Sequence, residues 1–433
     1  MMGPEIVGAI GLVVLVVLLF SGIWIGAAMA LVGFFGYASI MGFGPAFRGI
    51  PQILFTTVGD YPMSAVPLFV FMGMLLSNTE IGKDLYESAY KLVGQLRGGL
   101  AMATVVACAL FAAITGVPAP ALATMGKVAL PEMKKYNYDE KLSVGSIACA
   151  APLAFVIPPS MSFIIYGILT ENSIGLLFMA GIIPGILLTL LYCLVIAIIT
   201  ARNPQAGPPG PKTSFKEKVL SLKGTWHMIL LFVLMLGGIY GGIFTPTEAG
   251  AIGGFGAVLI GLSNRRLTLK KILDALFEAG QTTAMVMLLI VGAYIFMKFM
   301  AVSKLPILLG EIAAQLPVPK MVIFTGIVVL YLILGMFLDI FSAVILTMPI
   351  IYPVALSLGF DPIWFGVVIT LVIVIGVITP PVGLDCFVFS GLTGIPLSTV
   401  FSSIIPFFIA DIICIIIVSS FPQLSLFIPR LMQ

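Results

Sequence analysis

Long apolar stretches separated by short polar segments run through the whole of this 433-residue chain. They cover roughly residues 6–42, 50–79, 98–133, 142–170, 174–201, 226–262, 276–302, 319–357, 362–395 and 397–428. Since a helix of about 20 apolar residues spans a bilayer, the pattern predicts an all-α polytopic membrane protein. The stretches 6–42 and 226–262 are too long for one crossing, so each should cross twice.

The two halves of the chain repeat at an offset of 222 residues. The matching positions are Pro131 with Pro353, Asp139 with Asp361, Pro158-Pro159 with Pro380-Pro381, and Pro184 with Pro406. A helix breaks inside a membrane only where the freed backbone groups line a protein cavity or meet an ion. Paired breaks in corresponding halves are therefore a strong sequence sign of a transporter's binding site. The sequence predicts a secondary transporter built from two repeats.

Charged residues are few and unevenly placed. They make up 9% of the chain, against about 25% in soluble domains, and the net charge of +3 gives no sign of nucleic-acid binding. Most basic residues fall in the segments 83–97, 134–141, 202–223 and 265–271. The positive-inside rule places these segments in the cytoplasm, which puts both termini in the periplasm and inverts the second repeat. The N-terminus lacks the basic region of a signal peptide, so we expect 6–42 to be retained.

These features predict that each repeat divides into scaffold helices, an amphipathic arm helix at the membrane interface and transport elements. The predicted parts are scaffold helices at 1–79 and 226–302, arm helices at 80–97 and 303–318, and transport elements at 98–201 and 319–433. Within the transport elements, re-entrant hairpins are predicted at 98–133 and 319–357, and broken helices at 142–170 and 362–395. The proline-rich, basic stretch 202–225 is expected to be an exposed cytoplasmic linker.

In the first repeat, the tip of the hairpin should face the Pro-Pro break. Open carbonyls and half-helix C-termini are oxygen donors that suit Na⁺, which predicts a first sodium site between tip and break. Ser160 and Ser162 would begin the resumed helix, where hydroxyls and free N–H groups suit a carboxylate or sulfonate. The predicted sodium-site residues are Thr115, Gly116, Val117 and Pro158, and the predicted substrate-binding residues are Thr115, Pro159, Ser160 and Ser162.

The second repeat presents acidic residues at the corresponding places. An acidic residue deep in a bilayer is costly unless it meets a cation or a cavity, so Asp339 is the best single candidate for a cation ligand. The alternative for Asp339 is a helix cap, and Asp385 either caps the resumed helix or joins the site. The predicted second sodium site comprises Asp339, Thr379, Pro380 and Gly383, and the predicted substrate-binding residues are Asp339, Pro381 and Gly383.

Other chemistries find little support in the sequence. A P-loop is absent, because Gly126-Lys127 is followed by Val128. The five cysteines lack metal-ligand spacing, and the single histidine, His227, cannot build a zinc site. The chain is therefore not expected to be an enzyme or to hold an organic cofactor. An anion channel is a third class, but paired broken helices favour alternating access. The acidic residues expected to be structural are Asp60, Glu171, Asp361 and Asp411.

Several motifs resemble one family of membrane transporters. The segment GGIYGGIFTPTEA at 237–249 strongly resembles a signature of the DctM family, the large membrane subunit of TRAP transporters. The segments at 98–101, 157–160, 178–185 and 379–383 are also similar to that family, so the resemblance covers essentially the whole chain. It implies a sodium-driven transporter of the bacterial inner membrane, whose hairpins and broken helices move as an elevator against the scaffold. It also implies two partners: a periplasmic substrate-binding protein (DctP-type) and a small four-helix membrane subunit (DctQ-type).

The first hairpin tip departs from the family pattern. The family usually has a tip similar to Ser-Gly-Ser-Ser, whereas this chain has Thr115-Gly116-Val117-Pro118. A cation there must rely on backbone oxygens and Thr115, or the site is altered. Glu248 lies within the signature, on a scaffold segment, and is expected to be structural. The expected function is import of a small organic anion, a carboxylate or sulfonate; the alternative is a standalone Na⁺- or H⁺-coupled anion symporter of similar architecture.

Overall fold

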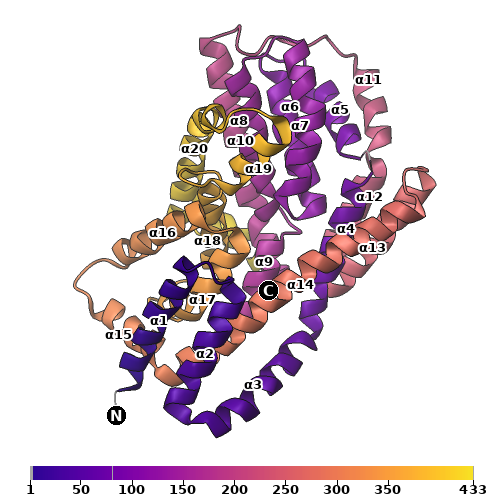
Figure 1. Cartoon of the computed structure of the whole chain (residues 1–433). Helices are drawn as coiled ribbons and strands as arrows, with labels where there is room; N and C mark the ends of the chain where they lie inside the picture. Colours follow the sequence, from indigo (N-terminus) through magenta and orange to yellow (C-terminus); the bar gives the residue numbers. More distant parts are fainter. Residues whose placement is uncertain (1–2, 80, 433) are drawn as a thin grey trace.

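The computed structural model describes residues 3–79 and 81–432, and this part of the chain consists of helices joined by turns (Figure 1). The helices of the first repeat are α1 (Pro4–Phe20), α2 (Ile25–Met41), α3 (Phe43–Val58), η1 (Tyr61–Ser64), α4 (Ala65–Ser77), α5 (Ile81–Val93), α6 (Gly99–Thr115), α7 (Pro118–Lys135), α8 (Glu140–Ala150), η2 (Ala151–Phe155), α9 (Met161–Thr170) and α10 (Ile174–Arg202). Those that follow are α11 (Phe215–Ser221), η3 (Leu222–Gly224), α12 (Trp226–Tyr240), α13 (Pro246–Ser263), α14 (Leu269–Ser303), α15 (Leu305–Gln315), α16 (Lys320–Phe337), α17 (Ile340–Ser357), α18 (Pro362–Gly376), α19 (Leu384–Thr393), α20 (Leu397–Ser420) and α21 (Gln423–Arg430).

Five of the described helices are long and apolar enough to cross a membrane: α10, α14, α16, α17 and α20. The bent pair of α3 with η1–α4 would make a sixth. The predicted all-α membrane architecture is thereby confirmed. Four residues of the predicted parts lie outside the described residues: Met1 and Met2 of the scaffold, Glu80 of the arm and Gln433 at the C-terminal end.

Helix boundaries recur at the offset found in the sequence. The helices α7 and α17 begin and end 222 residues apart, and α6 matches α16 to within a residue. The repeated aspartates both cap helices: the Asp139 carboxylate accepts a bond from the Leu142 amide at 3.0 Å, and that of Asp361 accepts one from the Ile363 amide at 2.9 Å. Capping by Asp stabilises a helix start by about 1 kcal/mol, which explains this pair without any role in binding.

The long apolar stretches divide into helices in two ways. The stretches 6–42 and 226–262 each form two helices, α1–α2 and α12–α13, as their length predicts. The stretch 50–79 is not one straight helix, because the chain bends by 52° between α3 and the η1–α4 segment. Pro62 sits in the first turn of η1, where its missing N–H costs no hydrogen bond, so the new helix starts readily after the bend.

Some of the helices predicted to form the scaffold pack with their backbones close together. In Figure 1 the long helix α14 crosses the molecule diagonally, packed against α2 and α4. A Cβ added to Gly292 of α14 would meet the Gly26 backbone of α2 at 2.2 Å, and one added to Gly33 would meet the Ile295 backbone at 2.8 Å. Such close contact leaves no gap for sliding, since small residues bring helices within van der Waals distance inside a membrane.

The helices predicted to be transport elements interlace between the two repeats. Helix α9, which follows the first break, packs on α17 of the second hairpin, while α19, which follows the second break, packs on α7 of the first hairpin. Helix α20 likewise lies along α8. Each repeat therefore supplies part of the packing of the other, and the two breaks lie within one unit.

The segment 202–225 was expected to be an exposed connector, and most of its described residues are exposed, although the segment is not detached from the helices around it. Backbone bonds tie it to the arm helix and the hairpin base: the Gly98 amide donates to the Gly207 carbonyl at 2.8 Å, and the Gly210 amide to the Gly94 carbonyl at 2.9 Å. The Thr213 hydroxyl donates to the Lys91 carbonyl at 2.8 Å. The cause is that the last turn of α5 and the first of α6 leave unpaired backbone groups, which the linker satisfies.

Candidate functional site

The first break lies between η2 and α9 and is buried. Its Pro158–Pro159 peptide bond is cis, like that of Pro380–Pro381 in the second break. Ser160 is the N-cap of α9: its hydroxyl accepts a bond from the Phe163 amide at 3.4 Å and donates to the Phe155 carbonyl at 2.5 Å. The Ser160 side chain thus begins the resumed helix, as predicted, and is engaged by the protein's own backbone.

The first hairpin tip touches the first break directly. Gly116 has a left-handed backbone (φ 65°), and a Cβ there would lie 2.9 Å from the Pro159 carbonyl oxygen. On its other side, α4 closes over the tip, because a Cβ on Gly73 would lie 2.6 Å from the Thr115 carbonyl oxygen. The Thr115 hydroxyl is buried and lies 3.1 Å from the Phe111 and Val117 carbonyl oxygens. The first tip is therefore enclosed on both sides.

The second hairpin tip carries its charge as a helix cap. Asp339 is the N-cap of α17: one carboxylate oxygen accepts bonds from the Phe341 and Ser342 amides at 3.0 and 3.1 Å, and the other accepts the Ser342 hydroxyl at 2.5 Å. At the same place in the first hairpin, Val117 is the N-cap and makes no side-chain cap bond. The cap is one of the two roles weighed for Asp339; it occupies both carboxylate oxygens with N–H and O–H donors.

The second break is open where the first is closed. Pro380 and Pro381 are exposed, and the Thr379 hydroxyl donates to the Ile375 carbonyl of its own helix at 2.6 Å. Gly383, with φ 57°, is the N-cap of α19 and receives no side-chain cap. The alternative in which Asp385 caps this helix therefore does not hold.

Asp385 occupies an unusual position beside the second break. The residue is only 7% exposed, and its backbone amide donates to the Val377 carbonyl at 3.1 Å. One of its carboxylate oxygens, Oδ2, is buried and has no hydrogen-bond partner among the described residues. The nearby Ile378 carbonyl accepts a bond from the Cys386 thiol at 3.3 Å. An unpaired buried carboxylate oxygen is costly unless a proton or a cation joins it.

Contacts between the repeats tie the first break to the helix that leads to the second break and to the second hairpin. The Ser162 hydroxyl, just after the first break, lies 3.0 Å from the Thr370 hydroxyl, which precedes the second break. The Phe155 ring meets Phe341, next to the second tip, edge-on with 5.8 Å between centroids. Ser162 was predicted to face substrate; in the structure it ties one broken helix to the other.

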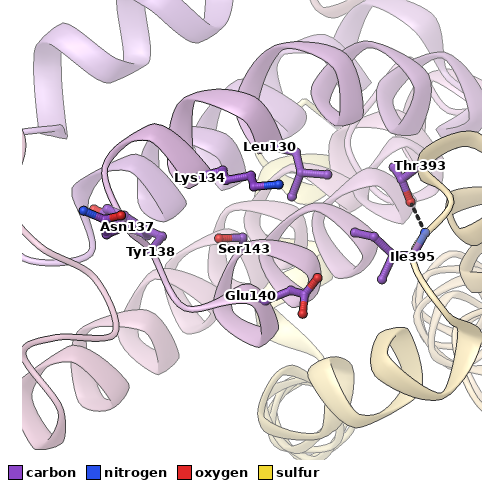
Figure 2. Close-up of a pocket in the computed structure, with 8 residues that line it drawn as sticks. All are labelled: Leu130, Lys134, Asn137, Tyr138, Glu140, Ser143, Thr393 and Ile395. Carbon is purple, nitrogen blue, oxygen red and sulfur yellow. Dashed lines mark hydrogen bonds between the residues drawn. The ribbon is translucent and has the colours of Figure 1, made fainter.

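One cavity in the described part of the chain lies away from these residues. Figure 2 shows it at the base of the first hairpin, where Lys134 and Glu140 extend from α7 and α8 and Thr393 of the second repeat lies opposite; its volume is about 650 Å³. It is far from the tip, because Lys134 lies at the opposite end of α7 from Pro118. A second cavity of about 450 Å³ includes Asp60 and Glu171. Sequence reasoning pointed to neither cavity, because their lining residues come from distant segments.

A family model described as "Tripartite ATP-independent periplasmic transporter, DctM component" matches residues 12–424. The chain belongs to this family. It is 34% identical to the "C4-dicarboxylate TRAP transporter large permease protein DctM" of Pseudomonas aeruginosa over 92% of this chain and 93% of that protein. It is 32% identical to the "Ectoine/5-hydroxyectoine TRAP transporter large permease protein UehC" of Ruegeria pomeroyi, over 93% of each chain.

A further relative is a longer protein. The "Isethionate TRAP transporter permease protein DctMQ" of Oleidesulfovibrio alaskensis is 32% identical over 87% of this chain and 60% of its own length. Among solved structures, the YdaH transporter of Alcanivorax borkumensis has a similar fold, with a TM-score of 0.56, 15% identity, and coverage of 88% of this chain and 89% of that one.

Family membership confirms the resemblance noted from the motifs. The chain is the large permease component of a bacterial tripartite transporter and a multi-pass membrane protein, with a transport role and not an enzymatic one. A tripartite system requires a further membrane component and a substrate-binding component. The signature residue Glu248 has a structural place: it forms a capping box with Thr245 at the start of α13.

Proposed function

We propose that this permease imports a small organic anion, a carboxylate or a sulfonate, coupled to sodium, by an elevator movement of its transport unit. The observation that carries the proposal is the pair of backbone breaks held in one interlaced unit, each beside a hairpin tip. In membrane transporters such breaks supply carbonyl oxygens for cations and helix N-termini for anions. Relatives named for C4-dicarboxylates, isethionate and ectoine support an organic ion as the substrate.

For sodium, the second break offers the better-supported site. To the predicted ligands Asp339, Thr379, Pro380 and Gly383 we add Asp385, whose unpaired oxygen would gain a partner from a bound cation. Sodium prefers oxygen donors, and an intramembrane carboxylate is stabilised by the cation it binds. At the first break, the carbonyls of Thr115, Gly116, Val117 and Pro158 would have to serve without a carboxylate.

For the anion, the start of α9 is the proposed contact. This helix begins at the first break with Ser160 and Ser162 near its N-terminus, where the helix dipole favours negative charge. Both hydroxyls bond within the protein, so the backbone N–H groups of this turn are the proposed donors, together with Pro159 and, in the second repeat, Pro381 and Gly383.

The elevator movement is proposed from the contrast in packing. Glycine contacts between α2 and α14 make the scaffold tight, whereas the hairpins and broken helices pack mainly on one another. The arm helix α5 touches both parts: it packs on α6 and α7, and its Asp84 forms an ion pair with Arg266 in the loop before α14. In this proposal basic segments face the cytoplasm and both termini the periplasm. Cysteines placed at Lys216 and Lys304 should label from opposite sides of the membrane.

The sodium proposal is tested by Asp385→Asn in proteoliposomes. The variant keeps the shape of the side chain but loses the charge, so we expect the sodium concentration for half-maximal uptake to rise about tenfold. Asp411→Asn is the matched control, since Asp411 is also buried with an unpaired oxygen but lies in α20, bonded to the Tyr192 hydroxyl at 2.5 Å. An unchanged sodium dependence in Asp385→Asn would remove this residue from the site.

The partner proposal is tested by omission. Uptake should require both the small membrane subunit and the cognate periplasmic binding protein. Sodium-dependent uptake by this chain alone would favour the alternative, a standalone Na⁺- or H⁺-coupled anion symporter. Flux that neither saturates nor follows a gradient would instead favour a channel. Thermal-shift screening of the binding protein would identify which anion is carried.

A further inference from the structure

An apolar cavity of about 550 Å³ separates the first break from the scaffold. Its walls come from three helices: α6 of the first hairpin, α10 that follows the first broken helix, and α12. Residues that define these walls are Ala109 and Leu110, Ile186 and Leu190, and Val233 and Gly237; Pro158 of the break also lines the cavity. The cavity therefore lies between the proposed moving unit and the scaffold.

The mouth of the cavity is lined by exposed apolar side chains, which is typical of a protein surface that faces the hydrocarbon of a membrane. Leu110, Ile186, Leu190 and Val233 line it and are each between 42% and 61% exposed, although they belong to apolar helices. Because apolar side chains dominate its lining, water would find few hydrogen-bond partners in this cavity. Apolar cavities of this kind stay dry. The volume falls within the range of about 300–1,000 Å³ that holds one small ligand. What covers these walls in a bilayer must itself be apolar.

We propose that one acyl chain of a membrane phospholipid occupies this cavity. The acyl chain would fill the space between the first hairpin and α12, next to Pro158. There it would make the van der Waals contacts that the protein side chains leave unmade. The Tyr240 hydroxyl, at the C-terminal end of α12, is buried without a hydrogen-bond partner in the described residues and offers a donor to an ester oxygen. The lipid site follows from the cavity and does not depend on the proposed function.

The second repeat shows why this site is specific to the first. Its equivalent pocket, of about 330 Å³, is lined by Thr379, Pro380, Ile404 and Phe408, the counterparts of Ile157, Pro158, Ile182 and Ile186. Phenylalanine replaces isoleucine at the last of these positions and takes up part of the space. In addition, no predicted scaffold helix among the described residues lines that pocket, whereas α12 lines the first. The first cavity, which is larger and is bounded by α12, is therefore the one that can hold an acyl chain.

Filling the cavity tests the proposal. A Cβ on Gly237 meets nothing within 4 Å, so Gly237→Phe places a ring in the space without a backbone clash. Gly280→Phe in α14 is the matched control, since Gly280 is an exposed helical glycine of the scaffold with equally open surroundings. Ala109→Phe, from the α6 wall, is a second variant in case the first does not fold.

The full chain with its small subunit is placed in phosphatidylcholine vesicles that contain a lipid with a photoreactive diazirine on its acyl chain. After irradiation, labelling of Val106 and Leu236, which line the cavity, should fall about tenfold in Gly237→Phe and Ala109→Phe and stay unchanged in Gly280→Phe. Equal labelling in all variants, or crosslinks at these residues to the small subunit instead of lipid, would overturn the proposal. Lost uptake with unchanged labelling would count against the lipid site and leave the transport proposal intact.

Discussion

The two helix breaks share one backbone plan and differ in almost every side chain around it. The first is buried: its tip touches the Pro159 carbonyl and α4 closes behind it. The second is exposed at Pro380 and Pro381, and carboxylates lie at its tip and in the helix that resumes. The first repeat thus presents backbone oxygens in an enclosed space, whereas the second has carboxylates beside exposed prolines. Equivalent position in a repeat does not imply equivalent chemistry.

The capping residues of the two hairpins explain part of this difference. Asp339 satisfies the first amides of α17 with its side chain, whereas α7 starts with Val117 and Pro118, and Pro118 has no amide to satisfy. At the start of α7, Val117 makes no side-chain cap bond. The first tip is therefore uncharged and close-packed, whereas the second keeps a carboxylate.

The largest effect should come from the enclosed side. Gly116→Val puts a β-branched residue into a left-handed backbone, which costs roughly 1–2 kcal/mol of stability. The new side chain also presses against the Pro159 carbonyl, and this overpacking costs about 1–3 kcal/mol more. We expect uptake to fall about a hundredfold. The control is Leu338→Val at the matching position of the second hairpin, where the backbone is extended. If Gly116→Val transports as well as Leu338→Val, the tip-to-break contact has no role.

A smaller effect should come from the charge of the open side. Asn is as good a helix cap as Asp, so Asp339→Asn should leave the complex folded while it removes the charge. We expect the sodium concentration for half-maximal uptake to rise about tenfold. Asp361→Asn, the N-cap variant of α18, provides the comparison, because it loses a charge at a cap that serves structure only. Equal sodium dependence in the two variants would make Asp339 a cap and nothing more.

The smallest effect is expected from the hydrogen bond between Ser162 and Thr370, which joins the two broken helices. A double-mutant cycle of Ser162→Ala and Thr370→Val should show a coupling of about 1 kcal/mol in the free energy of unfolding in detergent. Thr379→Val in combination with Ser162→Ala serves as the reference pair, since the Thr379 hydroxyl bonds within its own helix. Additive losses in the Ser162–Thr370 pair would mean that the breaks are not coupled through this contact.

Much of the fold could be predicted because membrane helices are local structures. Apolar length, proline position and the 222-residue offset were enough to locate the helix pairs α6–α7 and α16–α17, the breaks and the paired helices of 6–42 and 226–262. The bonds that attach the linker to its neighbours could not be predicted, since they use backbone groups at the ends of α5 and α6 that only the folded chain presents to it.

The sequence by itself determined that the chain spans a membrane, repeats itself, breaks at two Pro-Pro pairs and carries the family's signature. These properties follow from composition and spacing along one helix at a time. The tertiary structure alone decided which side chains are free to bind. It engages Ser160, Ser162 and Asp339 in bonds within the protein, and it leaves an oxygen of Asp385 without a partner. The reason is that hydrogen-bond partners and burial come from segments that lie far apart in the chain, and no local pattern encodes them.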